Sequence, residues 1–394
     1  MKPLSTVLIL FARYGEGHIQ VAEALKQAFE RRGAVRVVLL DLFQESHPVV
    51  NAVSKSMYRK SFTWLSGIYG WSYDRTKEMS HDRLSSRLFN SFGMHTLNEA
   101  IRTLQPDVVI NTFPMLAMPE WRRQTGQRIP TFAVLTDFVL HNRWIHPEID
   151  KYYVATDDLA DQLVRKGIRQ DQIVVSGIPI RSAFQIAGDV RQERQRLAEK
   201  YQLSPSKQKV LLMAGGYGIS SNWPEIIQQF HHNDWEVVVV CGKNESARAE
   251  LLQQTAHLSG VHIFGYVKQI EELMKTADLL VTKAGGITLA EAMSLNLPLL
   301  LLSPVPGQEM ENAQYLEAKG VARIINSRQQ IREINALLDS LNTTEHALGR
   351  QDSAERVVRD IQNTWQEVTT RRGTRELATL SSFHTAHVAA DLPD

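Results

Sequence analysis

Short apolar runs separated by helix-length segments recur along the whole chain, and this rhythm is the strongest constraint on its fold. Each run is a continuous block of aliphatic residues, which is typical of parallel strands covered by helices on both faces. In the first half the predicted strands are Val7–Ala12, Val35–Leu40, Asp107–Asn111, Thr131–Leu135, Tyr152–Ala155 and Ile173–Ser176. In the second half they are Lys209–Met213, Trp235–Cys241, Val261–Phe264, Leu279–Thr282, Leu299–Leu302 and Ala322–Ile325. Two successive sets of strand–helix units predict two doubly wound, Rossmann-like α/β domains.

The chain is long enough for two such domains, with 394 residues. We expect the first domain over residues 1–180, a polar linker over 181–207 and the second domain over 208–345. Residues 346–394 are expected to form a C-terminal helix and a flexible tail. Val357, Ile361, Trp365 and Val368 have the spacing of one helix face, whereas the composition turns polar and small after about Thr370.

The composition excludes several classes of function. A formal net charge of +1 gives no reason to expect a nucleic-acid partner. The single cysteine, Cys241, rules out an internal disulfide and a thiolate metal site. We find no paired carboxylates of a glycosidase, no metal-spaced cluster and no nucleophile elbow. The start lacks the features of a signal peptide and no apolar stretch reaches ~18 residues, so we expect the protein in the cytoplasm.

The loop after the first predicted strand carries a glycine turn and a histidine. Gly15 and Gly17 precede His18, at the start of a predicted helix. An imidazole there lies at the carboxyl edge of the sheet, where a helix N-terminus lowers its pKa and favours a neutral base. Two glycines alone are weak evidence, because Gln20 stands where the dinucleotide fingerprint has its third glycine. A helix-capping or solvent-exposed histidine is the alternative interpretation.

Further polar residues follow the third and fourth strands of the first half. Asp137 and His141 are expected at the same sheet edge as His18. Asp137 is a candidate to orient a base or to hold a substrate hydroxyl, and the alternative is a turn or N-cap aspartate. A lone loop histidine such as His141 is more often structural or solvated.

Two loops of the second half have the character of phosphate sites. Gly215 and Gly216 follow the strand at Lys209, and Gly285 and Gly286 follow the strand at Leu279. Each glycine pair opens a predicted helix, where free amides and the helix dipole favour a phosphate.

The residues after the second of these loops are suited to the rest of a nucleotide sugar. Thr288 adds a hydroxyl in the first helical turn, and Glu291 is placed to bridge two ribose hydroxyls, although a surface helix residue would look the same. Gln308, Glu309 and Asn312 follow the next strand and are suited to sugar hydroxyls. These residues predict a nucleotide-sugar site rather than a dinucleotide site.

Residues 55–90 combine basic and aromatic side chains. Seven basic residues against three acidic ones leave an excess of four positive charges. Lys55, Tyr58, Arg59, Trp64 and Trp71 are typical of this mixture, which interfacial segments use on anionic lipids. A helix pair whose aromatic residues lie in the core is the alternative, and stacking on nucleic-acid bases is disfavoured by the neutral overall charge.

These observations coincide with a set of short stretches that resemble a known family. The stretches are Tyr14-Gly15-Glu16-Gly17-His18, Ile110-Asn111-Thr112-Phe113-Pro114, Thr136-Asp137-Phe138 with His141 and Trp144, Lys151-Tyr152-Tyr153-Val154-Ala155-Thr156-Asp157, Ser176-Gly177-Ile178-Pro179-Ile180-Arg181, Val240-Cys241-Gly242-Lys243-Asn244, Gly285-Gly286-Ile287-Thr288-Leu289-Ala290-Glu291, and Pro304-Val305-Pro306-Gly307-Gln308-Glu309 with Asn312. In this order they resemble the processive diacylglycerol β-glucosyltransferases of Gram-positive bacteria, which are related to the plant monogalactosyldiacylglycerol synthases. The similarity runs from about residue 5 to residue 340.

The resemblance implies a GT-B fold, in which two Rossmann-like domains face a central cleft. It implies inverting transfer of glucose from UDP-glucose to 1,2-diacylglycerol, and then to glucosyldiacylglycerol, at the cytoplasmic face of the cell membrane. UDP-glucose is then a substrate, and neither a cofactor nor a metal is implied. The alternatives are a UDP-galactose-dependent synthase, a transferase for lipid I or a soluble acceptor, and a non-catalytic UDP-sugar sensor. The oligomeric state is not implied.

The resemblance also implies roles for particular residues. His18 resembles the acceptor-activating base, and Gly286, Ile287 and Thr288 resemble the diphosphate cradle, with Glu291 as the ribose ligand. Glu309 and Asn312 would contact the sugar, and the backbone near Val267 would contact uracil. Two positions depart from the pattern: Ala284 replaces a common proline, and Gly216-Tyr217 replaces a small residue and histidine.

Overall fold

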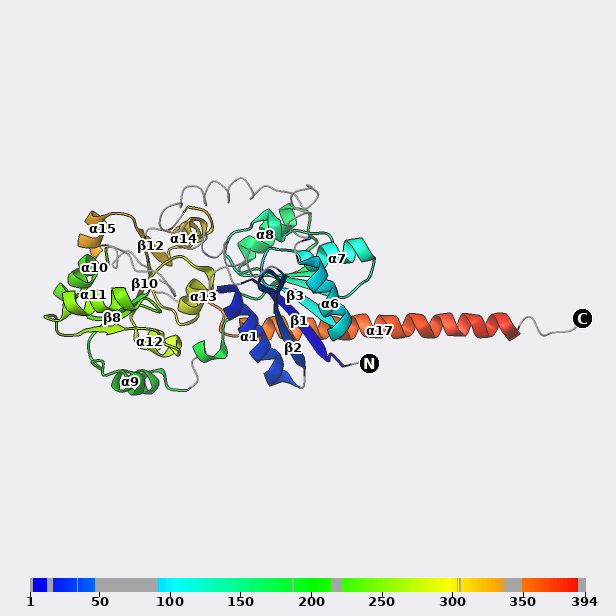
Figure 1. Ribbon diagram of the computed structural model, residues 1–394, viewed down its shortest axis with the longest axis horizontal. Coiled ribbons are helices and arrows are strands. Elements are labelled where there is room, and N and C mark those ends of the chain that lie inside the picture. The colour runs from blue at the N-terminus through cyan, green and yellow to red at the C-terminus, as the bar shows by residue number, and fades with distance from the viewer. Residues whose placement is uncertain are drawn as a thin grey trace, which may run out of the picture.

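The computed structural model describes residues 3–12, 17–33, 35–46, 91, 93–185, 188–213, 222–302, 304, 306–334, 336 and 349–388. Within these residues the chain forms two lobes, each built around a six-stranded sheet (Figure 1). Every predicted strand is present, and its ends differ from the prediction by at most one residue. The predicted α/β class with two doubly wound sheets is therefore confirmed.

The first sheet has the strand order β2-β1-β3-β4-β5-β6, and all of its strand pairs are parallel. Its strands are β1 (Thr6–Phe11), β2 (Arg36–Asp41), β3 (Val108–Asn111), β4 (Thr131–Val134), β5 (Lys151–Val154) and β6 (Ile173–Val175). The helices of this lobe are α1 (Gly17–Arg32), α2 (Leu42–Ser46), α6 (Met94–Leu104), α7 (Ala117–Thr125) and α8 (Asp157–Arg165), with 3₁₀ turns η1 (Asn142–Trp144), η2 (Gln170–Gln172) and η3 (Ser182–Phe184).

The second sheet has the order β12-β11-β10-β7-β8-β9 and is also parallel throughout. Its strands are β7 (Lys209–Met213), β8 (Glu236–Val240), β9 (Val261–Phe264), β10 (Leu279–Thr282), β11 (Leu299–Leu302) and β12 (Ala322–Ile325). The helices are α9 (Val190–Lys200), α10 (Trp223–His232), α11 (Glu245–Thr255), α12 (Ile270–Thr276), α13 (Gly286–Ser294), α14 (Gln308–Ala318) and α15 (Arg328–Arg332). The sheets lie within the expected domain limits, 1–180 and 208–345; the limits themselves stay a prediction.

Helices cover both faces of each sheet, which explains the continuous apolar runs of the sequence. All residues of the central strands β3, β4 and β10 are buried, for example, as are those of β7 and β11. Burying aliphatic side chains on both faces stabilises a parallel sheet, because each removes apolar surface from water.

Each sheet reverses its strand order at one point. In the first sheet the reversal lies between β1 and β3, and in the second it lies between β7 and β10. The loops that leave neighbouring strands at such a point diverge and open a crevice at the carboxyl edge of the sheet, where ligands of α/β proteins bind. The loops singled out in the sequence leave the sheets at these two points.

The C-terminal helix α17 (Ser353–Val388) returns from the second lobe to the first and packs against α1 (Figure 1). Val357, Ile361 and Trp365 are buried in this contact, as their spacing predicts. The carboxylate of Asp360 accepts a hydrogen bond from the Tyr153 hydroxyl at 2.8 Å and pairs with Lys151 at 2.9 Å.

The end of α17 differs from the sequence-based expectation. The helix runs on to Val388, well past Thr370, where we expected a frayed tail. Polar composition misled the prediction, because Arg, Glu, Leu and Ala in this stretch are good helix formers and the next proline is Pro393.

Candidate active site

His18 lies in the first turn of α1, at the carboxyl edge of the first sheet. Its Nδ1 is 2.8 Å from the backbone oxygen of Thr112, the residue after β3, and its ring meets the Phe113 ring edge-on at 4.9 Å between centroids. A carbonyl oxygen can only accept, so Nδ1 carries the proton and donates it. The neutral imidazole therefore has its lone pair on Nε2.

The surroundings of His18 favour the neutral ring. Burial lowers the pKa of His18 below 6.5, opposed by the negative charge of Asp137 and by the hydrogen bond to the Thr112 carbonyl. The position in the first turn of α1 acts in the same direction as burial, because a helix N-terminus disfavours a positive charge. At neutral pH the Nε2 lone pair is available to take up a proton.

Two other histidines of the first lobe have the opposite tautomer. Nδ1 of His141 accepts the backbone N–H of Arg143 at 3.1 Å, and Nδ1 of His146 accepts that of Glu148 at 3.1 Å. In their neutral forms these rings carry the proton on Nε2. Their one nitrogen lone pair, on Nδ1, already accepts a backbone N–H, so neither ring has a lone pair left to take up a proton. Among these three histidines, His18 alone has the form of a general base.

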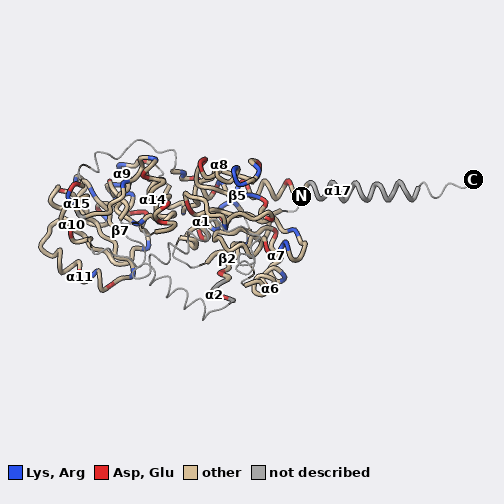
Figure 2. Tube along the Cα trace, turned by 90° about the horizontal axis from the view of Figure 1, so that it is seen from above, with Lys and Arg blue, Asp and Glu red and all other residues tan. Residues whose placement is uncertain are grey.

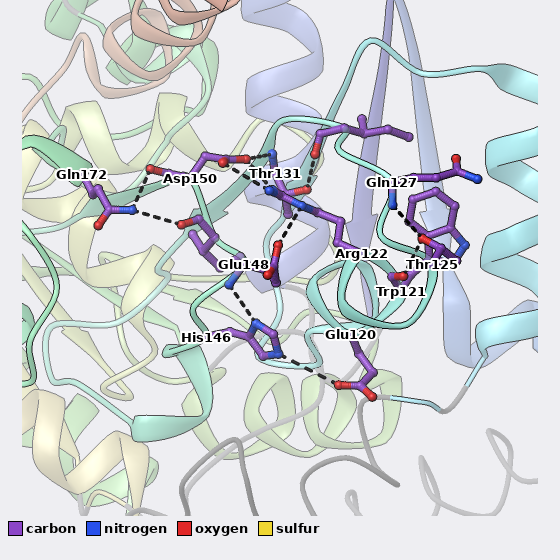
Figure 3. A network of polar contacts seen from close by, with 12 residues as sticks. Glu120, Trp121, Arg122, Thr125, Gln127, Thr131, His146, Glu148, Asp150 and Gln172 are labelled. Atoms are coloured by element: carbon purple, nitrogen blue, oxygen red, sulfur yellow. Dashed lines mark hydrogen bonds and ion pairs between the residues drawn. The ribbon is translucent and has the colours of Figure 1, made fainter.

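A polar network around the buried guanidinium of Arg122 holds the segment that contains His146 (Figure 3). The guanidinium of Arg122, on α7, pairs with Asp150 at 2.5 Å and with Glu148 at 3.4 Å. Asp150 also accepts the Thr131 backbone N–H at 2.7 Å, at the start of β4. His146 Nε2 lies 4.0 Å from a carboxylate oxygen of α7 (Figure 3). The network therefore ties residues 146–150 to α7 and β4.

The helix α13 begins at Gly286, where the second sheet reverses its order. Its first hydrogen bond within the helix runs from Leu289 N–H to Gly285 oxygen at 3.1 Å. The amides of Gly286, Ile287 and Thr288 therefore precede the helical ladder and lie at the positive end of the helix dipole. This geometry favours a bound anion, and the phosphate site at the glycine pair stays a prediction.

The N-termini of α1 and α13 face each other across the two lobes. A Cβ on Gly17 would lie 3.2 Å from the Ile287 side chain. A Cβ on Gly286 would lie 2.1 Å from the backbone oxygen of Thr136, which no side chain can tolerate. Glycine at 286 is thus required for the close approach of residues 283–286, called the donor loop below, to the first lobe.

Asp137 is buried and its carboxylate is bound by the second lobe. Oδ1 accepts the side-chain amides of Gln308 and, at 3.2 Å, of Asn312, both on α14. Burial raises the pKa of Asp137. Three interactions oppose this rise: the hydrogen bond from Gln308, the charge of His18 and the hydrogen bond from Asn312. Asp137 therefore contacts the residues that the sequence assigns to the sugar.

Glu291 lies on α13 and is 6% exposed. Burial raises the pKa of its carboxyl to about 8; the positive charge of Arg181 opposes this rise and the negative charge of Glu271 adds to it. Arg181 is bound to Glu271 at 2.9 Å. Glu291 is thus a buried carboxyl beside an ion pair, which excludes the surface-helix alternative.

The loop after β9 carries the residues expected near uracil. Tyr266 is 64% exposed, with the ammonium of Lys243 at 5.6 Å from its ring centroid. Val267 is half-buried against the core. Glu309 lies half-buried in the first turn of α14.

Several predicted site residues lie outside the described residues. These are Gly215, Gly216, Lys55, Tyr58, Arg59, Trp64 and Trp71.

Sequence reasoning in turn missed the roles of the Thr112 carbonyl, Arg181 and Tyr315. Arg181 stands in a stretch quoted for the resemblance and Tyr315 lies one turn after Asn312, but a backbone acceptor such as Thr112 has no signal in its residue type.

Three further observations concern the described part of the chain as a whole. Its His, Cys, Asp and Glu side chains form no group of three or more that could hold a metal ion. Among the same residues, no helix has both the length and the apolar character to cross a bilayer. Figure 2 shows Lys and Arg mixed with Asp and Glu over both lobes rather than gathered into one field.

Comparison with known proteins places this geometry in a family. Residues 18–180 match the family model of monogalactosyldiacylglycerol (MGDG) synthase, and residues 196–364 match the glycosyltransferase family 28 C-terminal domain. A processive diacylglycerol β-glucosyltransferase of Bacillus cereus (strain G9842) is 42% identical over 327 residues, which is 82% of this chain and 83% of the relative.

Solved structures show the same fold at low identity. A UDP-GlcNAc 2-epimerase from Neisseria meningitidis, bound to UDP-GlcNAc, has a TM-score of 0.59 at 15% identity and covers 91% of this chain and 100% of its own. MurG of Acinetobacter baumannii has a TM-score of 0.56 at 12% identity and covers 91% and 99%. Two facing Rossmann-like lobes with this family 28 domain define a GT-B glycosyltransferase. At the identity and coverage of the Bacillus relative, the chain belongs to the family of the processive diacylglycerol β-glucosyltransferases.

Proposed function

We propose that this protein transfers glucose from UDP-glucose to the free hydroxyl of 1,2-diacylglycerol with inversion, and then extends glucosyldiacylglycerol. The observation that carries the proposal is the form of His18: its Nδ1 proton is committed to Thr112 and its Nε2 is free to accept a proton beside the N-terminus of α13. The printed name of the Bacillus relative supports the choice of sugar and acceptor.

In the proposed reaction, Nε2 of His18 takes the proton from the acceptor hydroxyl as its oxygen attacks C1 of glucose. The new bond forms on the face opposite UDP, the bond from C1 to the diphosphate oxygen breaks, and the α-linked donor yields a β-linked product. The bond electrons leave with UDP, whose charge is stabilised by the amides of Gly286, Ile287 and Thr288. The proton on His18 is then lost to solvent.

The remaining donor contacts follow from position on the second lobe. Glu291 would hold the ribose hydroxyls, and the backbone at Val267 would contact uracil. Gln308 and Glu309 at the start of α14 would face the sugar, with Gly215 and Gly216 contributing from the loop after β7. Asp137 would assist His18 from the first lobe, because its charge stabilises the imidazolium that forms during transfer.

We further propose that the protein acts as a peripheral protein on the anionic cytoplasmic face of the cell membrane. The acceptor is a membrane lipid, and the basic and aromatic residues of 55–90 supply the composition of an interfacial segment. Lys55, Tyr58, Arg59, Trp64 and Trp71 would then contact lipid headgroups.

The test is transfer in mixed micelles that contain diacylglycerol and equal amounts of ¹³C-labelled UDP-glucose and unlabelled UDP-galactose. Mass spectrometry separates the two sugars by isotope and counts the sugars added, so the result identifies donor, acceptor and processivity. We expect His18→Ala to lower kcat by about 10²–10⁴-fold. His232→Ala, on the exposed end of α10, is the matched control and keeps the wild-type rate. Wild-type turnover by His18→Ala would refute the assignment of the base.

A further inference from the structure

The side chain of Asn312 uses all of its hydrogen-bonding groups to join the two lobes. Its oxygen accepts the backbone N–H of Phe138 at 3.0 Å, from the first lobe. Its amide nitrogen donates to Asp137 Oδ1 at 3.2 Å and to the backbone oxygen of Ala284 at 3.3 Å. Asn312 is 1% exposed, so these partners lie in a buried contact. A carboxamide with these bonds has no donor left for a sugar hydroxyl.

The same face of α14 continues the contact toward the surface. The ring of Tyr315, one turn on, stacks on Phe138 with centroids 6.1 Å apart and planes 14° apart. Its hydroxyl donates to Asp158 at 2.7 Å, and Lys319 pairs with the same carboxylate at 2.6 Å. Residues 312, 315 and 319 lie on one side of the helix, so α14 presents a continuous strip to the first lobe.

The contact made by Asn312 adjoins both halves of the candidate active site. The Phe138 loop includes Thr136, whose backbone oxygen abuts Gly286 at the start of α13. Ala284 precedes this same glycine in the donor loop. Asn312 therefore links the loop that carries Asp137 to the loop that carries the helix amides.

We propose that the Asn312 carboxamide is an interdomain clasp, which positions the donor loop against the loop of Asp137 before any sugar binds. This goes beyond a sugar contact, the role that family resemblance implies. The inference rests on the proposed function only for the roles of the two loops; the clasp itself is a contact between the two lobes. Asn312 is thus a positioning residue.

The test measures the separation of the lobes in the absence of nucleotide. Cys241 is the only cysteine and is buried, so spin labels can be attached selectively at Gln127→Cys in the first lobe and Gln253→Cys in the second, both exposed. Electron-spin distance measurements are then made on the full chain. Asn312→Asp places a carboxylate against Asp137 and the Ala284 oxygen, and we expect a longer, broader distance distribution.

A reciprocal pair keeps the test specific. In Asp137→Asn with Asn312→Asp, the new amide at 137 donates to the new carboxylate at 312, which still accepts the Phe138 N–H. We expect this pair to return the distances toward the wild-type value. Asn296→Asp is the charge control, because Asn296 is exposed and its positive φ of 55° suits Asp as well as Asn. It should leave the distances unchanged.

Kinetics separates the clasp from a plain sugar contact. We expect Asn312→Asp to lower kcat by about 10²-fold through misplacement of the two halves, with the Kd of UDP unchanged. Two results would overturn the clasp. One is an unchanged distance between the spin labels in nucleotide-free Asn312→Asp; the other is a double variant, Asp137→Asn with Asn312→Asp, whose label distance is as long as that of Asn312→Asp alone. If the wild-type protein transfers no glucose, the proposed function fails while the distances still decide the clasp. Retained UDP binding shows that each variant is folded, and Asn312→Ala replaces Asn312→Asp if the latter does not fold.

Discussion

Replacing Glu291 by glutamine should raise the free energy of unfolding at high pH and weaken the binding of the nucleotide donor. The carboxyl is buried on α13, and burial raises its pKa to about 8 from the ordinary 4.5. A folded-state pKa above the unfolded one means that the folded protein binds the proton more tightly, so stability falls as the pH rises from about 4.5 to about 8. Glutamine has nearly the same shape and no charge, and removes this dependence.

The magnitude follows from the two pKa values. At 1.36 kcal/mol per unit, the difference of about 3.5 units corresponds to an upper limit of about 5 kcal/mol above pH 8. Water entry and relaxation around the charge reduce it, and we expect Glu291→Gln to raise the free energy of unfolding by about 2 kcal/mol at pH 9. At pH 4.5 and below, where both states of the wild type bind the proton, the two proteins should be close.

The assay is urea unfolding of the wild type and the variant at pH 4.5, 7 and 9, followed by tryptophan fluorescence. UDP binding measured by calorimetry at pH 9, where the Glu291 carboxyl is ionised, should weaken, because an amide cannot accept hydrogen bonds from both ribose hydroxyls as a carboxylate does. A stability difference that does not grow between pH 4.5 and pH 9 would refute a buried Glu291 carboxyl with a raised pKa. An unchanged Kd for UDP would refute Glu291 as the ribose ligand.

Three further outcomes follow from the structure. Because the pKa of His18 lies below 6.5, kcat/KM for the acceptor should lose half its value only below pH 6.5; an acid limb centred above that pH would contradict a buried base held by Thr112. Gly286→Ala should lower kcat by about 10²-fold while circular dichroism stays unchanged, because its Cβ would press the lobes apart at the Thr136 oxygen; wild-type turnover would show that this contact does not form. Asp360→Ala leaves the buried Tyr153 hydroxyl without its acceptor, and should lower the free energy of unfolding by about 1–3 kcal/mol in urea titrations, whereas loss of an exposed acid such as Asp171 should change it little.

Local pattern was sufficient to predict the two sheets and the position of the site on them. Continuous apolar runs identify strands that are buried on both faces, and parallel strands place the residues that follow them at one edge. His18 and the Gly286 helix could therefore be assigned to facing sheet edges from the sequence. The depth at which Glu291 is buried could not, because a surface helix and a buried one share the same local composition.

The partners of the site residues were decided by the tertiary structure alone. The tautomer of His18 depends on the backbone oxygen of Thr112. The hydrogen bonds that the Asp137 carboxylate accepts come from Gln308 and Asn312 on the other lobe. Hydrophobic periodicity reports which face of an element is buried, but not which polar group meets it from a distant part of the chain. By itself the sequence determined the two α/β lobes and the residue types at their facing edges. Packing within the first lobe decided which nitrogen of His18 is basic, and the docking of the two lobes decided which side-chain amides are already bound.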